Sequence, residues 1–337
     1  MTIREIATVA KVSPATVSLV LNNKKGVGEK TRSRVQKILR EYGYTAEQYS
    51  RKGERCRITF LKYRTHGMAV EENQGFIASI IDWIENECRN CYYDLIVCNC
   101  TADTIEETLK NIADDAPDGI IFLGTELDPK LCQAFNMIHT PFVVLDNSMR
   151  YENIDSVVMD NENIAATAVK YLHKLGHRKI GYFKTNVEIS NLKERYAGYL
   201  NAMTELELTP PEPLCLTPTL NGAYSDMKKW LASGVYSPEG AVFADNDSIA
   251  IGAARALQEA GYGIPKDISI IGVDDIPYSA MAMPALTTMR VSRSMLGVLA
   301  VDVLRKRIQN PDWPVMHVQI AGKLIERDST APLRGSQ

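Results

Sequence analysis

Residues 3–22 read IREIATVAKVSPATVSLVLN and contain two short apolar stripes at helical spacing. The first stripe predicts a helix that ends near Ala10, and Ser13-Pro14 then supplies an N-cap and a proline at the start of a second helix. A third amphipathic helix is expected from about Glu29 to Tyr42, with Gly28 as its cap. Two short helices joined by a tight turn indicate a helix-turn-helix. The stripes are Ile3, Ile6, Ala7 and Ala10, then Val17, Val20 and Leu21, then Val35, Ile38, Leu39 and Tyr42.

The charge of the chain is divided unevenly. Residues 1–57 hold 13 Lys and Arg against 5 Asp and Glu, a balance of +8. The remaining 280 residues hold 25 basic and 36 acidic residues, a balance of −11. A basic head on an acidic body is typical of a nucleic-acid-binding module joined to another kind of domain. On these grounds alone, a solvated basic face or a three-helix packing module without DNA contact remains an alternative.

The face of the second helix that points away from the predicted core is expected to contact duplex DNA. An α-helix fits the major groove, hydroxyl groups near its N-terminus suit phosphate oxygens, and Lys and Arg bind phosphates in a salt-dependent way. The outward residues are Pro14, Ala15, Thr16, Ser18 and Leu19, and the nearby basic residues are Lys24, Lys25, Lys30, Arg32 and Arg34.

The first 45 residues resemble the DNA-binding head of the lactose-repressor/galactose-repressor (LacI/GalR) family of bacterial regulators. The resemblance implies that Pro14, Ala15 and Leu19 read base edges through apolar contacts, for instance with thymine methyl groups. The matching patterns are Ile6-Ala7-x-x-Ala10-x-Val12-Ser13-x-x-Thr16-Val17-Ser18-x-Val20-Leu21-Asn22, Lys30-Thr31-Arg32-x-x-Val35 and Tyr42-Gly43-Tyr44. The predicted DNA-binding residues are Ser13, Pro14, Ala15, Thr16, Ser18, Leu19, Asn22, Lys24, Lys30, Thr31 and Arg32.

Three positions depart from the pattern of the family head and hinge. Lys11 stands where the turn usually has glycine, and a positive φ there would cost lysine about 1 kcal/mol. Residues 46–56 form a polar linker, which in the family becomes a hinge helix whose Leu wedges into the minor groove. Here Gly53 stands at the position of that Leu and Ala46 at that of the usual Pro. We therefore expect weaker DNA bending than in typical relatives, or a hinge that never becomes helical.

From residue 57 onward, apolar strands alternate with helical patterns. Repeated βα units imply parallel sheets covered on both faces, and so many strands favour two α/β lobes over one sheet. The expected strands are 58–61, 95–98, 120–123, 142–145, 180–183, 241–244 and 268–273, with helices at 76–87, 165–175, 194–206 and 249–260. Strand 95–98 is expected to be buried, so its cysteine and Cys100 are interpreted as core residues rather than zinc ligands.

Polar side chains follow several of these strands, where α/β sheets bind ligands. Asp146 and Asp274 each come directly after a strand, and Arg195 opens a helix soon after another. Carboxylates, Asn246 and a guanidinium converging on one cleft suit a small polyhydroxyl ligand such as a sugar or nucleoside. The alternative is that each Asp caps the following helix, which we favour for Asp245 and Asp247.

The family resemblance continues over the body. It implies a periplasmic-binding-protein-like pair of lobes, joined by three crossovers, that dimerises and closes on an effector. It also implies effector contacts by Asp146, Arg195, Asn246 and Asp274, and by Met159 in a first crossover at 156–161. The matching patterns are Leu172-x-x-Leu175-Gly176-His177-Arg178-x-Ile180, Arg195-x-x-Gly198, Phe243-Ala244-x-Asn246-Asp247, Gly272-Val273-Asp274-Asp275 and Pro284-x-Leu286-Thr287-Thr288.

The resemblance sets the expected domain boundaries. They are a helix-turn-helix head at 1–45, a linker at 46–56, a core at 57–330 and a tail at 331–337, with an N-subdomain at about 57–160 and 290–318 and a C-subdomain at about 161–288 and 319–330. The loop 62–74 lacks the Asn-Pro-Phe-Phe stretch of the family and carries Lys62, Arg64 and His66. These basic groups favour a phosphorylated or acidic effector if they reach the cleft, and are otherwise a solvated loop.

Catalytic motifs are absent from the sequence. It contains no G-x-S-x-G, no G-x-x-x-x-G-K-[ST] and no H-E-x-x-H pattern, so we expect neither an enzyme nor a bound cofactor or metal. The sequence predicts a cytoplasmic, ligand-responsive repressor that binds a near-palindromic operator as a homodimer and a sugar, sugar phosphate or nucleoside as effector. A solute-binding protein without a DNA role and a sugar-handling enzyme on a two-lobed fold are the alternatives.

Overall fold

The computed structural model describes residues 3–21, 26–41, 55–70, 74–127, 131, 135, 137–238 and 240–333. The chain divides into two compact units, Met1–Cys56 and Arg57–Gln337. Several sequence predictions concern residues outside this described part of the chain. They are the predictions for Asn22, Lys24, Lys25 and Tyr42, and for the linker positions Ala46 and Gly53.

The N-terminal unit contains the three expected helices, α1 (Ile3–Ala10), α2 (Pro14–Leu21) and α3 (Glu29–Glu41). The described side chains of the predicted stripes form one small core, because residues three or four apart lie on the same face of a helix. Its buried residues are Ile6, Ala7, Ala10, Val17, Val20, Val35 and Leu39, with Val12, Val27 and Ile38 packed against them.

The turn between α1 and α2 has the geometry of a left-handed helix end. Lys11 has a φ of 51°, and the Val12 N–H donates to the Ala7 carbonyl at 3.0 Å, as in a Schellman motif. Ser13 then caps α2, since its Oγ accepts from the Thr16 N–H at 3.1 Å. Lysine therefore adopts the conformation for which the family turn usually has glycine.

The second unit is built on two six-stranded sheets. The sheet of the N-lobe has the strand order β11-β5-β4-β3-β1-β2, and the sheet of the C-lobe has the order β12-β10-β9-β8-β6-β7. Parallel pairing connects β11, β5, β4, β3 and β1 in one lobe and β10, β9, β8, β6 and β7 in the other, whereas β12 is antiparallel to β10. This is the predicted two-lobed α/β architecture.

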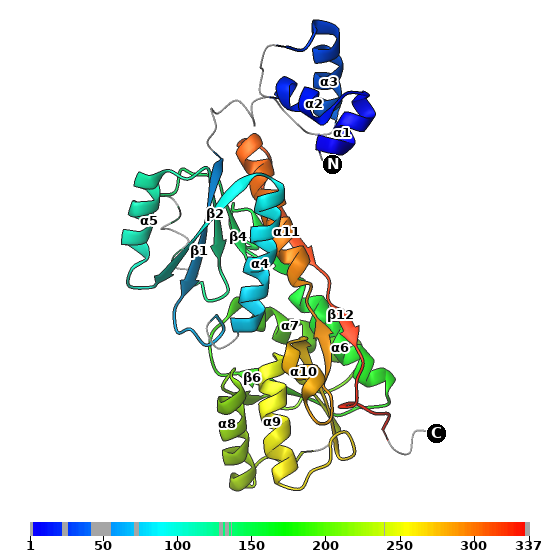
Figure 1. Ribbon diagram of the computed structural model, residues 1–337. Coiled ribbons are helices and arrows are strands. Elements are labelled where there is room, and N and C mark those ends of the chain that lie inside the picture. Colours follow the sequence, from blue (N-terminus) through cyan, green and yellow to red (C-terminus); the bar gives the residue numbers. More distant parts are fainter. Residues whose placement is uncertain are drawn as a thin grey trace. The chain divides into compact units, whose positions relative to one another are not determined.

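Helices cover both faces of each sheet (Figure 1). The N-lobe elements are β1 (Cys56–Arg64), α4 (Gln74–Asn90), β2 (Tyr93–Thr101), α5 (Ile105–Asp115), β3 (Gly119–Leu123), β4 (Phe142–Leu145), β5 (Ser156–Met159), α11 (Arg293–Gln309) and β11 (His317–Ile320). The C-lobe elements are α6 (Asn161–Lys174), β6 (Ile180–Thr185), α7 (Ser190–Glu205), β7 (Leu214–Leu216), α8 (Leu220–Ser233), β8 (Gly240–Ala244), α9 (Asp247–Glu259), β9 (Ile268–Asp274), α10 (Pro277–Met281), β10 (Thr287–Arg290) and β12 (Lys323–Ile325).

The chain crosses between the two sheets three times, after β5, after β10 and after β11. Arg290 still pairs with Asp274 in the C-lobe sheet. Ile320 still pairs with Met159 in the N-lobe sheet, two residues beyond the predicted boundary at 318. Residues 156–159, interpreted as crossover in the sequence, are strand β5.

All seven predicted strands are present, but the prediction that 95–98 is buried is wrong. Strand β2 lies at the edge of its sheet, and Ile96 and Val97 are 40% and 45% exposed. An apolar run has the same sequence pattern at an edge as in the middle of a sheet, so the pattern alone cannot place it. Among the described residues, none of the helices has the length and apolar character that crossing a bilayer requires.

Gly198 lets α7 approach α6 closely, and replacing it with alanine should destabilise the body. A Cβ at this position would lie 2.2 Å from the backbone carbonyl oxygen of Glu162. We expect Gly198→Ala to lower the free energy of unfolding by about 1–3 kcal/mol or more, measured by urea denaturation. Gly75 is the matched control: it is also helical, and nothing lies within 4 Å of the position its Cβ would take. Gly75→Ala should be neutral or slightly stabilising; equal losses in the two variants would contradict the close approach.

Candidate functional site

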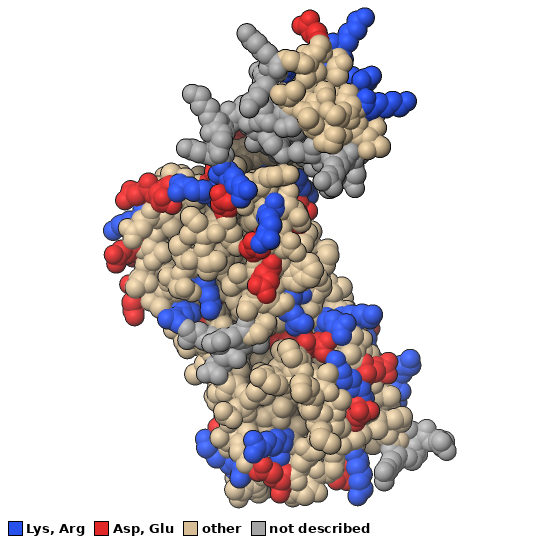
Figure 2. All heavy atoms as spheres, in the orientation of Figure 1, with Lys and Arg blue, Asp and Glu red and all other residues tan. Residues whose placement is uncertain are grey.

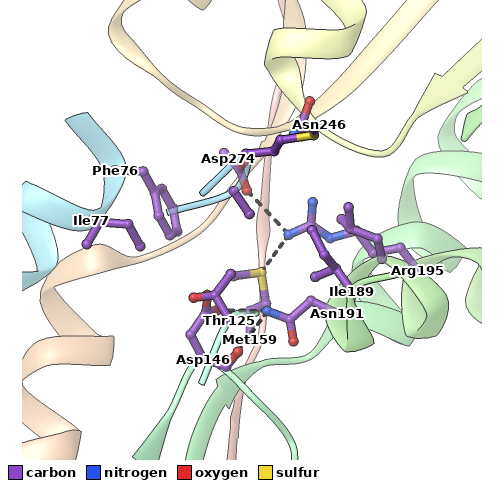
Figure 3. A pocket seen from close by; sticks show the side chains of 13 residues that line it. Phe76, Ile77, Thr125, Asp146, Met159, Ile189, Asn191, Arg195, Asn246 and Asp274 are labelled. Atoms are coloured by element: carbon purple, nitrogen blue, oxygen red, sulfur yellow. Dashed lines mark hydrogen bonds and ion pairs between the residues drawn. The ribbon is translucent and has the colours of Figure 1, made fainter. Parts of the chain in front are cut away.

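A pocket open to solvent lies between the two lobes. All five predicted effector residues are among those that line it, and they come from both lobes (Figure 3). The N-lobe contributes Met68, Ala69, Phe76, Ile77, Thr125, Asp146 and Met159, and the C-lobe contributes Ile189, Asn191, Leu192, Arg195, Asn246 and Asp274.

Asp146 follows β4 at its carboxyl end and has a φ of 63°. Its Oδ2 accepts from the Thr125 hydroxyl at 2.6 Å, and its Oδ1 accepts from Nδ2 of Asn191 at 2.9 Å. Burial raises the pKa of Asp146 to about 6, and these hydrogen bonds offset part of that rise. Because Asn191 belongs to the C-lobe, this carboxylate is a direct polar contact between the lobes.

Arg195 is buried and all three of its guanidinium nitrogens have partners in the site. Its Nε donates to Oδ1 of Asn161 at 3.0 Å, and one terminal nitrogen donates to the backbone carbonyl of Asp245. The other terminal nitrogen lies 3.3 Å from Oδ1 of Asp274 and 2.8 Å from the Met159 sulfur. A thioether is a weak acceptor, so a ligand oxygen can replace the sulfur at little cost.

Asp274 ends β9 with a φ of 111°, a strained value that is concentrated at functional sites in proteins. The next residue, Asp275, has different partners, since Arg290 and Arg327 donate to its two carboxylate oxygens, each at 2.6 Å. Of these two neighbouring aspartates, Asp274 therefore lines the pocket and Asp275 does not.

Asn246 is the N-cap of α9, because its Oδ1 accepts from the Ile249 N–H at 2.8 Å. The two aspartates beside it are structural, but neither is the cap expected from the sequence. Asp245 accepts from the Tyr182 hydroxyl and the Thr185 N–H inside the C-lobe.

Asp247 is fully buried and holds the loop after β9 to the neighbouring strand. It accepts from the Ile276 N–H and from the hydroxyl groups of Ser279 and Thr288, at 2.5–3.1 Å. Burial, with a further contribution from Asp274, raises the pKa of Asp247 to about 7.

The basic residues of loop 62–74, for which the sequence left a place at the cleft or in a solvated loop open, are not among the described residues that line the pocket. Lys62, Arg64 and His66 are absent from the described lining, in which Arg195 is the single basic side chain and Asp146 and Asp274 are the two acidic ones. Among the described lining residues, acidic side chains therefore outnumber basic ones.

Sequence reasoning missed several residues of this site. Thr125 lies just beyond the carboxyl end of β3, as Asp146 does for β4. The rule that ligands bind at the carboxyl ends of strands could therefore have identified Thr125 as well. Asn191 precedes Arg195 by one helical turn and faces the same way, which periodicity also indicates. The apolar residues, such as Phe76 and Ile189, carry no signal that separates them from core residues.

The predicted DNA-binding face lies on α2 and the start of α3. Ser13, Pro14, Ala15 and Lys30 are exposed. Thr16, Leu19, Thr31 and Arg32 are half-buried, and the side chain of Ser18 is outside the described residues. Figure 2 shows Lys and Arg side chains gathered on one side of this N-terminal unit.

Comparison with known proteins agrees with both units. Residues 2–47 match the model of bacterial regulatory proteins of the lacI family, and residues 169–330 match that of the periplasmic binding protein-like domain. The ribose operon repressor of Haemophilus influenzae is 31% identical over 99% of each chain. The PurR repressor of Vibrio atlanticus is 29% identical over 98% of this chain and 99% of its own.

The fold is also that of a solved lac repressor dimer bound to operator and the anti-inducer ONPF. That structure is 23% identical, with a TM-score of 0.74 over 98% of this chain and 99% of its own. A helix-turn-helix unit joined to a two-lobed binding body defines a ligand-responsive transcriptional regulator. The chain belongs to the lacI family of bacterial regulatory proteins.

Proposed function

We propose that this protein represses transcription in the cytoplasm by binding a near-palindromic operator as a homodimer, and that a small neutral effector in the pocket between the lobes controls the binding. The observation that carries the proposal is the convergence of Asp146, Arg195, Asn246 and Asp274 on one pocket in a chain that also has a helix-turn-helix unit. Two-fold symmetry of a dimer imposes a near-palindromic site on the DNA.

The effector acts on contacts between the lobes. Asn191 of the C-lobe donates to Asp146 of the N-lobe, and the Ser148 hydroxyl donates to Glu194 of α7 at 2.5 Å. A ligand that competes for Asp146 and Asn191, which line the pocket, changes the relative orientation of the lobes and therefore the spacing of the two heads. The affinities for effector and operator are then coupled reciprocally, typically by about 1–3 kcal/mol.

The charges and surfaces of the pocket favour a neutral ligand with one polar and one apolar face. Among the described lining residues, the two acidic side chains outnumber the single guanidinium, whose donors already have partners. The described lining therefore offers no second cation to a phosphate group, whose burial without one is costly. Apolar contact is offered by Phe76, Ile77, Ile189 and Leu192. We therefore favour a free sugar or nucleoside over a sugar phosphate.

A thermal-shift screen tests the effector proposal. At a concentration of about 100 times its Kd, a ligand stabilises the folded protein by about 2.7 kcal/mol, which moves Tm by several degrees. Neutral sugars and nucleosides, including D-ribose and adenosine, should contain the compounds that raise Tm, and their phosphates should not. Stabilisation by phosphates alone would contradict the neutral assignment.

A gel-shift assay with genomic fragments tests the regulatory proposal. The full chain should retard a subset of fragments, and compounds from the thermal-shift screen should change its affinity for them. A chain that binds the compounds but no DNA fragment would instead be a solute-binding protein.

Exposed apolar side chains on both lobes support the homodimer. In the C-lobe, Tyr278, Met281 and Met283 are 60%, 78% and 85% exposed and follow one another along α10 and the next loop. In the N-lobe, Ile96 and Val97 lie exposed on the edge strand β2. Clusters of exposed apolar residues in soluble proteins commonly mark interfaces, so we propose that these two surfaces meet their copies in the dimer.

DNA binding should depend steeply on salt. We expect log K to fall with log salt concentration by about 0.9 for each phosphate contact, and Lys30→Ala to reduce the slope by about 1 for every operator sequence. Lys174→Ala, an exposed lysine at the end of α6, should leave the slope unchanged. Titrations by fluorescence anisotropy at several salt concentrations measure this, and a flat salt dependence would contradict an electrostatic role for the head.

A further inference from the structure

The segment 65–70 forms part of the N-lobe wall of the pocket, through Met68 and Ala69. It connects β1 to the region before α4 and has no helix or strand of its own. It also lies in the loop where the sequence departs from the Asn-Pro-Phe-Phe pattern of its family. This stretch of irregular backbone therefore needs some other means of holding its conformation.

We infer that Glu126 is the positioning residue that holds this wall in place, an inference that rests on the proposed effector pocket. The side chain of Glu126 is fully buried and its carboxylate accepts five hydrogen bonds from the backbone of the segment. The remaining N–H, that of Met68, donates to Nδ1 of His66 at 3.1 Å. The donors to Glu126 are the N–H groups of Thr65 (2.8 Å), His66 (3.0 Å) and Gly67 (2.9 Å) on Oε2, and of Ala69 (2.9 Å) and Val70 (3.2 Å) on Oε1.

The chemistry of the contact requires a carboxylate. Burial alone would raise the pKa of Glu126, but the backbone donors of Gly67, Ala69 and Thr65 lower it more, so the pKa lies below its usual value. An ionised carboxylate has only acceptor sites, whereas a carboxamide would turn an NH₂ group toward backbone N–H groups. With glutamine at this position, several of the five hydrogen bonds are therefore lost, and the NH₂ group faces backbone N–H groups that are also donors.

The backbone around Glu126 joins the segment to the polar part of the pocket. The Thr65 hydroxyl donates to the Glu126 carbonyl at 2.8 Å, and the preceding residue, Thr125, donates to Asp146 inside the pocket. Gly67 has a φ of 77°, a conformation that L side chains rarely adopt. The turn that follows β3 therefore holds the backbone of 65–70 through Glu126 and the carboxylate of Asp146 through Thr125.

Hydrogen exchange of the full chain without ligand tests the inference through Glu126→Gln. Amides 65–70 should exchange about tenfold faster or more, because hydrogen bonds to a charged acceptor are lost, while amides of β3 and β9 keep their wild-type rates. Asp226→Asn is the matched control. Asp226 also accepts from a backbone N–H, that of Thr217, and from the Thr217 hydroxyl, but both residues belong to the C-lobe and are distant in sequence from 65–70. It should affect exchange near Thr217 and leave 65–70 protected.

A second variant acts from the other side of the same contact. Gly67→Ala strains the segment without changing the carboxylate, and it should also raise the hydrogen-exchange rates of amides 65–70. This variant still tests the contact if Glu126→Gln fails to fold. Wild-type protection at 65–70 in a folded Glu126→Gln protein, or equal losses throughout the body in both variants, would overturn the inference.

Ligand binding adds a readout that separates this inference from the proposed function. If D-ribose or adenosine raises the wild-type Tm, the rise should be at least halved in Glu126→Gln and unchanged in Asp226→Asn. Failure of every compound to stabilise the wild type would count against the proposed effector site, while the exchange measurement would still decide the role of Glu126.

Discussion

Replacing Arg195 with alanine should abolish the response to effector while the head still binds DNA. Removal of the guanidinium takes away the cation that lies 3.3 Å from Asp274 and the donor to Oδ1 of Asn161. Breaking a buried ion pair in this way typically costs about 3–5 kcal/mol, so the body should also lose stability. We expect no rise in Tm with any compound that stabilises the wild type, measured by thermal shift, and a retained gel shift without effector.

A milder substitution separates effector recognition from folding. Asp274→Asn keeps an acceptor oxygen for Arg195 and removes the negative charge, so it should retain most of the stability and still lose the effector response. Arg255→Ala is the control, because Arg255 forms an exposed ion pair with Glu259 at 3.1 Å on α9 and lies outside the pocket lining. An intact response in Arg195→Ala would show that the pocket is not the effector site, and loss of DNA binding in both pocket variants would indicate a folding defect.

The positions of the site residues could be predicted because they follow from local rules. The Ser13-Pro14 signal locates the start of α2, and apolar runs locate seven strands of the body. Parallel strands then bring Asp146 and Asp274 to carboxyl ends, where ligands bind in such sheets. The family resemblance added Met159, which nothing in its own sequence environment marks as a ligand contact.

The remaining features depend on contacts between distant parts of the chain. Glu126 looks like an ordinary acidic residue after a strand, and only the folded chain brings it to backbone groups about 60 residues earlier, at separations of 56–61 residues. The edge position of β2 follows from strand order rather than from the composition of 95–98. The sequence predicts a structural role for Asp245 and Asp247, and both are structural, but neither caps a helix. Their partners lie in other strands and loops, and the neighbouring Asn246 caps α9.

The double substitution of Met281 and Met283 by lysine should convert the dimer to a monomer and weaken operator binding by about 10²–10⁴-fold. A dimer places two heads on two half-sites, so the second contact forms at a high effective concentration that a monomer lacks. Lysine at these two exposed positions would bring like charges together across a symmetric interface. Sedimentation velocity measures the oligomeric state, and a gel shift on a two-half-site operator measures the affinity.

The same experiment distinguishes this surface from exposed apolar residues in general. Val235 is 77% exposed in the loop after α8, and Val235→Lys should leave both dimer and operator affinity unchanged. Binding to a single half-site should be equal in the wild type and the double variant, because the head is a separate compact unit that the substitutions do not touch. A double variant that stays dimeric would place the interface elsewhere, and one that is monomeric yet binds the full operator as tightly as the wild type would contradict the need for two linked heads.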